Sequence, residues 1–509
     1  MIRKRKSIAI NGGITVQKFP KSNEDKKDKN SVKVGANLFG NRFHKDETLY
    51  EFLIEFLLIF TSAKNSNGDG KMRFHDFSKD ETKFYFQPKM GLRRFIFYDK
   101  ARKSDSVPDD KIAYDRMINA LKAKIDQTDK RDEIVNAIHD LFYGYSVILK
   151  KRAWCAQNVL PLCPEMVFCA ANPNVAQRKK YPIRDDEPLC VVDKHFNFDK
   201  RNFLSRGGEL YYLHILQGLN GDQEKTKRLE YLIGNMIKND QLSKLINFIC
   251  DVWYEESGAN PADLRESLSI GYIPADAYLD CEKYAVSELI NFLSCNLNSI
   301  KRLEICAKGI MLQIMRMMSW RVGNYLGKGP HRWLVSMRAC DSQVVKKKAA
   351  KDFSELEDEF QNAFNLMARN LETPDEKYVS EIHDAKVNSF DILKSKGKEM
   401  QCIIPPKGAL ERFSLSEEVV TFLVLSIIEP EGKLTYDSFL DELYKHYRIV
   451  IGPKEYKESS INNNDLGLAN SFEENSQIFQ ELLRDTGFLR ELSDATSIVE
   501  NPYKRIQED

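Results

Sequence analysis

Apolar residues recur every three to four positions through most of the chain, from about residue 110 to residue 400. This spacing puts apolar side chains on one face of an α-helix and is typical of helices that pack on a core. The pattern predicts a mainly α protein with a large, irregular helical body and no regular repeat. The helices that we expect lie at 110–126, 131–152, 207–219, 223–238, 240–256, 274–296, 298–326, 351–371 and 374–397.

The segment before this body has a mixed pattern and predicts a small N-terminal α+β region, residues 1–108. An Asn-Gly turn between β-branched residues favours a hairpin at 7–18. A continuous apolar run predicts a helix at 46–63. Two short runs rich in aromatic and β-branched residues, Thr82–Gln87 and Arg93–Tyr98, predict strands.

The residues after about 405 form a separate pattern. Pro405 to Gly408 predicts a connector, because proline and glycine stop helices. It divides the helical body, 109–404, from a C-terminal module, 411–509. Periodicity and capping-box sequences predict three helices there, followed by a hairpin. The caps that we expect are Ser414 with Glu417, Thr435, and Ser471 with Glu474, and the hairpin strands are Phe488–Leu492 and Ser497–Val499.

This order of three helices and two strands resembles the winged-helix family, over roughly the last fifth of the chain. The resemblance implies DNA binding, with the third helix in the major groove. A helix that faces phosphates should be basic. The expected third helix instead has one base, Arg484, and its acids are Glu473, Glu474, Glu481 and Asp485. We therefore favour protein docking by this module and keep DNA binding as an alternative.

The charges of the whole chain nearly cancel, with 76 Lys and Arg against 75 Asp and Glu. Such a chain has no general attraction for nucleic acid, so any DNA contact needs a local patch. We expect such contact, where it occurs, from three basic clusters that are spread along the chain. They are Lys150, Lys151 and Arg152; Arg178, Lys179 and Lys180; and Lys346, Lys347 and Lys348.

The apolar runs and the cysteines indicate the cellular compartment of the protein. No apolar run reaches the ~20 residues that span a bilayer, and the basic first residues lack the apolar stretch of a signal peptide. We expect a cytoplasmic protein without membrane contact, whose ten scattered cysteines are free thiols. Cys155, Cys163, Cys169 and Cys190 lack the closely spaced pairs of zinc sites, so buried thiols are favoured over a zinc site.

No catalytic or cofactor motif is complete. Residues 65–76 align with an EF-hand loop, but Asp76 stands where calcium sites usually hold Glu, so we favour a solvated turn. Acid–lysine pairs at Asp193-Lys194, Asp199-Lys200 and Glu455–Lys457 would suit a metal-dependent nuclease. Because no strand ladder precedes them, we expect no metal or other cofactor and keep the nuclease as an alternative.

The whole chain is similar to helical accessory subunits of bacterial multi-gene anti-phage defence systems. The features are the N-terminal region, the helical body with Arg152-Ala-Trp-Cys-Ala-Gln157, and the terminal module with the stretch from Phe488 to Ser497. The resemblance implies a subunit without catalytic activity that works beside an ATPase, a helicase or a nuclease. We expect a non-enzymatic adaptor or scaffold of a multi-protein DNA-handling complex. A dispersed-site nuclease and a DNA-binding regulator are the alternatives.

Overall fold

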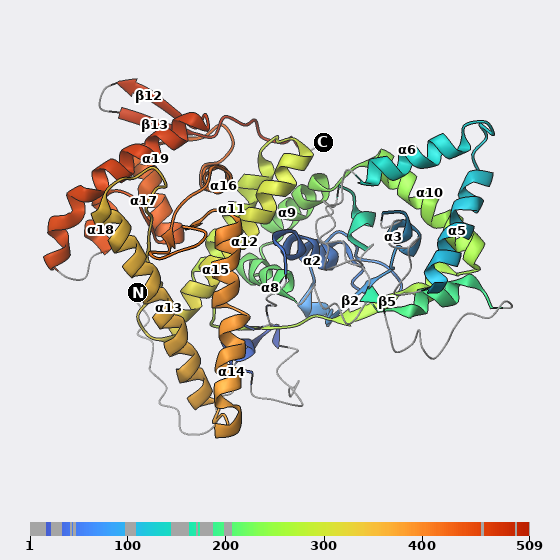
Figure 1. The fold of residues 1–509 in the computed structure, drawn as a ribbon, viewed down its shortest axis with the longest axis horizontal. Helices are drawn as coiled ribbons and strands as arrows, with labels where there is room; N and C mark the ends of the chain where they lie inside the picture. The colour runs from blue at the N-terminus through green and yellow to red at the C-terminus, as the bar shows by residue number, and fades with distance from the viewer. Residues whose placement is uncertain are drawn as a thin grey trace.

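The computed structural model describes residues 17–21, 33–40, 43, 47–96, 108–143, 162–168, 172–173, 187–197, 206–459, 463–493 and 496–507. Helices dominate the described chain, as the periodicity predicts (Figure 1). The α-helices are α1 (Val34–Phe39), α2 (Leu49–Thr61), α3 (Met90–Ile96), α5 (Pro108–Ala123), α6 (Arg131–Tyr143), α8 (Gly207–Leu219), α9 (Gln223–Met236), α10 (Asp240–Ser257), α11 (Cys281–Ser294), α12 (Ser299–Tyr325), α13 (Gln343–Asn370), α14 (Asp375–Val387), α15 (Phe390–Glu399), α16 (Glu417–Ile427), α17 (Tyr436–Tyr447), α18 (Pro453–Ser459) and α19 (Glu473–Asp485).

The described strands are short and form small sheets rather than one continuous sheet. They are β1 (Lys18–Phe19), β2 (Lys83–Phe86), β3 (Asn172–Pro173), β4 (Phe196–Asn197), β5 (Glu266–Ser269), β6 (Ile273–Pro274), β7 (Trp333–Leu334), β8 (Ile403–Ile404), β9 (Arg412–Phe413), β10 (Lys433–Thr435), β11 (Ile449–Val450), β12 (Leu489–Ser493) and β13 (Thr496–Glu500). Short 3₁₀ helices occur between them, at η2 (Phe77–Lys79), η3 (Pro164–Phe168), η4 (Leu189–His195), η5 (Pro261–Leu264) and η6 (Asn463–Phe472).

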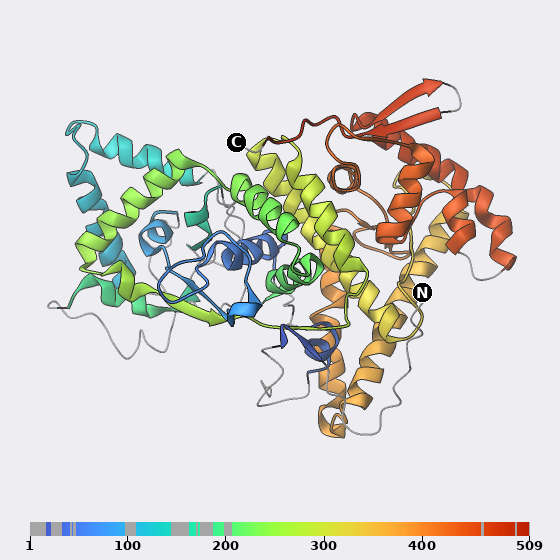
Figure 2. The ribbon, with the colours of Figure 1, turned by 180° about the vertical axis from the view of Figure 1, so that it is seen from behind.

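The centre of the molecule is a bundle of α2, α8, α11, α12 and α16 (Figures 1 and 2). Glycines bring α8 close to α2, because a Cβ on Gly208 would lie 2.2 Å from the backbone oxygen of Phe52. The Glu55 carboxylate on α2 then accepts the backbone N–H groups of Arg206 and Gly208, each at 2.8 Å. A buried carboxylate on a helix N-terminus satisfies donors that have no partner within the helix.

A second group of helices, α3, α5, α6 and α10, lies at one end of the molecule (Figure 1). Residues 93–96, predicted as part of a strand, are instead in helix α3. Every side chain of α3 is buried, including Arg93 and Arg94, so the helix has no exposed face to produce the usual alternation of apolar and polar residues. Arg93 and Arg94 pair with Asp110 of α5 at 3.2 and 2.6 Å, and Arg94 also reaches Asp193 at 2.7 Å.

The strand predicted at Thr82–Gln87 is confirmed as β2, but its partner is distant in sequence. β2 pairs antiparallel with β5, and β1 pairs with β6. The strands of the first hundred residues are therefore completed by residues 266–274. Most of the hairpin predicted at 7–18 lies outside the described residues.

Helices α13 and α14 form a long antiparallel pair that projects from the body (Figures 1 and 2). α13 begins at Gln343, eight residues before the predicted start at 351. The helix predicted at 374–397 is divided at Asn388 and Ser389 into α14 and α15. The Ser389 hydroxyl donates to the backbone oxygen of Ala385, a local bond that competes with helix continuation.

The C-terminal module contains the predicted helices and hairpin, with an additional strand before the second helix. β10, β13 and β12 form an antiparallel sheet in that order, and α16, α17 and α19 are the predicted helices. Two predicted caps are wrong, because α16 begins after Ser416 and α19 after Phe472, and neither residue makes a side-chain cap. The cap at Thr435 is confirmed, since its side chain accepts from the Ser438 N–H.

The predicted connector Pro405–Gly408 lies between β8 and β9, which pair with each other. The division of the chain at 404 and 411 stays a prediction. Within the part of the chain that the structure describes, no helix is both long enough and apolar enough to cross a bilayer.

Candidate functional site

The C-terminal module is fixed to the helical body by a buried charge network. Glu288 of α11 lies 2.8 Å from Arg316 of α12 and 2.8 Å from Nδ1 of His446 of α17, and it accepts a bond from the Tyr447 hydroxyl at 2.9 Å. Burial would raise the pKa of Glu288, but Arg316 and His446 outweigh it and hold that pKa at about 2. Removing one partner of an ion pair this deeply buried strongly destabilises the folded protein, because the other charge is then left buried and unpaired.

A second connection is made by backbone pairing and one asparagine. β7, from the body, pairs in parallel with β11 of the module. Asn475 of α19 is fully buried and donates to the backbone oxygens of Val335 and Ile451, at 3.0 and 2.9 Å. Its side-chain oxygen accepts the N–H of Met337 at 2.8 Å. These bonds hold α19 in a fixed position against the body.

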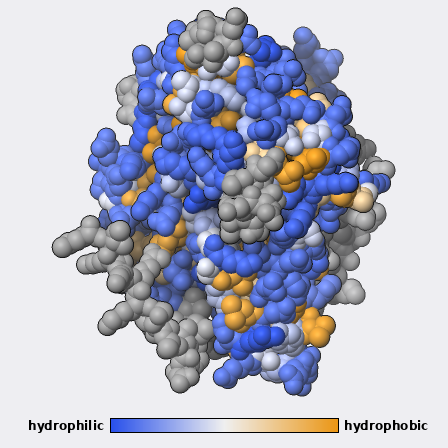
Figure 3. Space-filling view, turned by 90° about the vertical axis from the view of Figure 1, so that its left-hand side faces the viewer, coloured by the Kyte–Doolittle hydropathy of each residue, from blue (hydrophilic) through white to orange (hydrophobic). Residues whose placement is uncertain are grey.

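With that side of α19 buried, its exposed face is mainly acidic. Phe479 and Leu483 point into the core, and the exposed residues are Glu473, Glu474, Gln477, Glu481, Arg484 and Asp485. The single base of this face, Arg484, pairs with Glu491 of β12. Figure 3, which views the end of the molecule where the module lies, shows a largely hydrophilic surface with small hydrophobic areas.

A groove of about 420 Å³ runs beside this acidic face. We call it the α16–α19 groove, and its lining residues are Met337, Arg338, Ala339, Gln401, Leu415, Ser416, Glu417, Glu418, Ile478, Glu481, Leu482 and Asp485. Its apolar residues are Ile478 and Leu482 of α19, Leu415 before α16, and Met337 and Ala339 between β7 and α13. Its charges are acidic except for Arg338. Glu481 and Asp485 are among the acids predicted on the third helix, but the groove could not be predicted, because Glu417 and Glu418 lie more than 60 residues away in the chain.

Only one of the three predicted basic clusters lies in the described residues. Lys346, Lys347 and Lys348 are near the start of α13, and Lys346 pairs with Asp341 at 3.7 Å. The Asp341 N–H donates to Glu474 at 3.0 Å, so this cluster lies next to the acidic start of α19. Lys150, Lys151 and Arg152, and likewise Arg178, Lys179 and Lys180, lie outside the described residues.

The EF-hand-like segment forms a turn that uses its own polar groups. The Asn65 side chain accepts the N–H groups of Gly68 and Asp69, at 3.1 and 3.0 Å. Asp76 accepts from Ser78 and pairs with Lys79, which places its carboxylate in local bonds. Over the described ranges, no group of three or more His, Cys, Asp or Glu side chains is placed to hold a metal ion.

The residues of the predicted zinc and nuclease sites lie only partly in the described chain. Cys163 is a buried free thiol, whereas Cys155 and Cys169 lie outside the described residues. Asp193 accepts bonds from Arg94 and from the Trp253 indole, at 2.7 and 3.0 Å.

Of the remaining acid–lysine pairs, only Glu455–Lys457 lies in the described residues. The Glu455 carboxylate accepts the Gly452 N–H at 3.1 Å, and Asp199 and Lys200 lie outside the described residues. The Asp193 and Glu455 carboxylates therefore have structural roles.

Two other hollows offer less distinctive chemistry. A groove of about 1180 Å³ lies beside residues 73–79 and the start of α9, but Lys79 pairs there with Asp76 and Lys225 with Asp222. Its surface therefore presents no single sign of charge.

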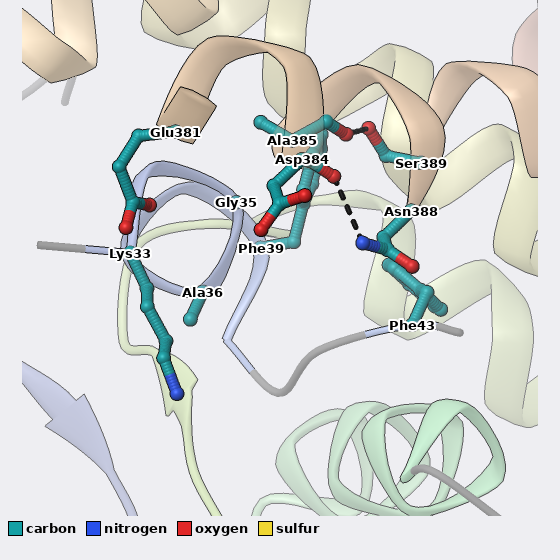
Figure 4. Close-up of a pocket in the computed structure, with 10 residues that line it drawn as sticks. All are labelled: Lys33, Gly35, Ala36, Phe39, Phe43, Glu381, Asp384, Ala385, Asn388 and Ser389. Atoms are coloured by element: carbon teal, nitrogen blue, oxygen red, sulfur yellow. Dashed lines mark hydrogen bonds between the residues drawn. The ribbon is translucent and has the colours of Figure 1, made fainter. Parts of the chain in front are cut away.

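A smaller cavity, about 160 Å³, lies between α1 and α14 (Figure 4). There Glu381 accepts the Val34 N–H at 3.4 Å, and the Lys33 side chain points away from the Glu381 carboxylate. The Asn388 amide donates to the backbone oxygen of Asp384 at 3.0 Å. The Glu381 bond serves the packing of α1 on α14 and the Asn388 bond ends α14, so we assign no ligand to this cavity.

The geometry therefore makes the exposed face of α19 and the α16–α19 groove the candidate site. Neither a family model, nor a curated protein, nor a solved structure matches the chain.

Proposed function

We propose that this chain is a non-enzymatic adaptor or scaffold subunit of a multi-protein DNA-handling complex. In this proposal the C-terminal module is winged-helix-like and docks on a protein. The observation that carries the proposal is the acidic exposed face of α19, whose one base is already paired. The resemblance to accessory subunits of anti-phage defence systems supplies the proposed setting, beside an ATPase, a helicase or a nuclease.

The size of the electrostatic effect favours docking over reading of DNA. Two unit charges about 4 Å apart in water interact by roughly 1 kcal/mol. Four acids facing phosphates would then oppose binding by a few kcal/mol. Non-specific DNA binding, with Kd of ~10⁻⁴ to 10⁻⁶ M, amounts to only about 5 to 8 kcal/mol. The repulsion between the acids of α19 and the phosphates would therefore cancel much of the DNA affinity that a recognition helix is expected to supply.

A specific observation supports the alternative of a DNA-binding regulator. The helices α16, α17 and α19 lie beside the three-stranded β10–β13–β12 sheet, and we propose that together they form a winged-helix-like module. A module of this kind could approach DNA through its hairpin instead of α19. Arg490 on that hairpin is exposed but pairs with Glu500. We therefore place this alternative second.

Titration of the full chain with labelled duplex DNA, at about 50 and 200 mM salt, tests the proposed role of α19. We expect Arg484→Glu to change DNA affinity by less than about twofold, because Arg484 does not contact phosphate in this proposal. The same samples with Mg²⁺ or Mn²⁺ and mixed DNA and RNA should show no cleavage. A loss of DNA affinity of tenfold or more in Arg484→Glu would contradict docking in favour of DNA reading, and cleavage by the wild type would support the nuclease.

A further inference from the structure

The α16–α19 groove combines an apolar floor with acidic edges. Ile478 and Leu482 lie one turn apart on α19 and are only half-buried, so they leave apolar surface in the groove. Leu415 and Met337 lie beneath them and are almost fully buried. The half-buried side chains of Ile478 and Leu482 can therefore receive apolar side chains from a partner.

Three of the four acids that line the groove are available to a partner. Glu418 pairs with Lys308 at 3.1 Å. Among the residues that the structure describes, the carboxylates of Glu417, Glu481 and Asp485 form no ion pair. The groove also contains Arg338, which donates to the neutral Gln401 amide. The unpaired charge of this surface is therefore predominantly negative.

The spacing of these groups matches a helix. Glu481 and Asp485 are four residues apart on α19, which is about 6 Å along a helix axis. Ile478 and Leu482 have the same spacing beside them. Helices that pack side by side commonly show this pattern, an apolar pair flanked by charges one turn apart. The apolar residues of the two helices meet, and the flanking charges select the partner.

We propose that the α16–α19 groove binds a basic amphipathic helix of a partner protein. This inference rests on the proposed docking function and names the chemistry of the partner. Leu, Met or Phe side chains of the partner would meet Ile478 and Leu482, and its Lys or Arg side chains would pair with Glu481 and Asp485. Glu417 gives a third negative charge across the groove.

The probe is a labelled synthetic peptide of about three heptads, with Leu at positions a and d and Lys at e and g. Its binding to the full chain is followed by fluorescence anisotropy at low and physiological salt. A groove of this size covers only part of a standard interface, so we expect affinity near the micromolar range that weakens as salt is added. A second peptide with Glu in place of Lys should not bind.

The decisive variant is Glu481→Lys with Asp485→Lys, which replaces two attractions by two repulsions. We expect it to weaken peptide binding by about tenfold or more. The matched control is Glu355→Lys with Asp358→Lys on α13, which makes the same charge change at exposed positions of another helix. We expect that control to stay within about twofold of the wild type. Thermal unfolding of both variants verifies that they fold.

Three results would overturn the proposal. They are no binding of the basic peptide by the wild type, equal binding of the acidic peptide, or an equal loss of binding in both double variants. None of these decides the adaptor function, since a partner could dock elsewhere on the chain. Recovery of a native complex that survives Glu481→Lys with Asp485→Lys would keep the proposed function and remove the groove from it.

Discussion

His331 is a residue whose charge is set by the fold. Its Nδ1 lies 3.0 Å from Glu359 and its Nε2 lies 3.5 Å from Asp352, both on α13. Burial lowers the pKa of His331, but these two carboxylates outweigh burial and raise it to about 9. The imidazolium therefore persists at neutral pH and connects the residues before β7 to α13.

This pairing makes part of the stability depend on pH. Because the folded pKa lies above the value of about 6.5 in an unfolded chain, the contribution of His331 is complete below about pH 6.5 and is lost as pH rises through about 9. Its size is on the order of 3 kcal/mol. We expect His331→Gln to lower the free energy of unfolding at pH 6 much more than at pH 9.5.

Urea unfolding of the wild type and of His331→Gln across that pH range measures the effect. His383→Gln is the control, because His383 is exposed on α14. A difference between wild type and His331→Gln that stays constant from pH 6 to 9.5 would show that the imidazole is neutral in the folded chain.

The buried charge network around Glu288 could be predicted from the sequence only in part. Glu288 and Arg316 are charged positions inside apolar helical stretches, which marks them as exceptions in the sequence. Their third partner, His446, is 158 residues from Glu288. Periodicity describes positions within one helix, so it could not predict which distant helix would contact these charges.

At the scale of elements, the contact of α12 with α16 depends on the absence of a side chain. Gly309 is in the middle of α12, and a Cβ there would lie 2.2 Å from the Phe422 ring of α16. Phe422 in turn packs on Phe292 of α11, with ring centroids 5.3 Å apart. The ring therefore has little room to move.

Gly309→Ala should lower the free energy of unfolding by about 1–3 kcal/mol, because overpacking outweighs the better helix propensity of alanine. The matched control is Gly234→Ala in α9, where the new Cβ would meet only the end of Met72 at 3.6 Å. That change should be neutral or stabilise by up to about 1 kcal/mol. Equal effects of the two substitutions in urea unfolding would contradict the close packing of α12 and α16.

Element prediction worked for α10, which has a buried and an exposed face, was predicted at 240–256 and spans Asp240–Ser257. It also worked for α8, at the predicted 207–219, although no residue of α8 is exposed. It failed for α3, which is buried on all sides and gives no periodic signal. The capping boxes at Ser414 and Ser471 failed because α16 begins three residues after Ser414 and α19 two residues after Ser471, so neither serine is the N-cap.

At the scale of the whole molecule, the module is an extension of the body and has little freedom to move. Glu288 and Asn475 join the two through buried bonds, and the C-terminal residues return to the body, where Arg505 pairs with Cys295 in a β-bridge. A partner bound to α19 would therefore be held in a fixed orientation to the helical body. This is the property expected of a scaffold. None of these long-range connections could be predicted from local sequence patterns, which carry no information on tertiary pairing.

The most direct test of the adaptor proposal is the mass of the native particle. The chain would be tagged at its own locus, purified without denaturation and weighed by native mass spectrometry. We expect a particle that contains the tagged chain and one or more different chains in fixed ratio. A particle that contains only the tagged chain, in one or several copies, would contradict the claim that this protein works as an adaptor.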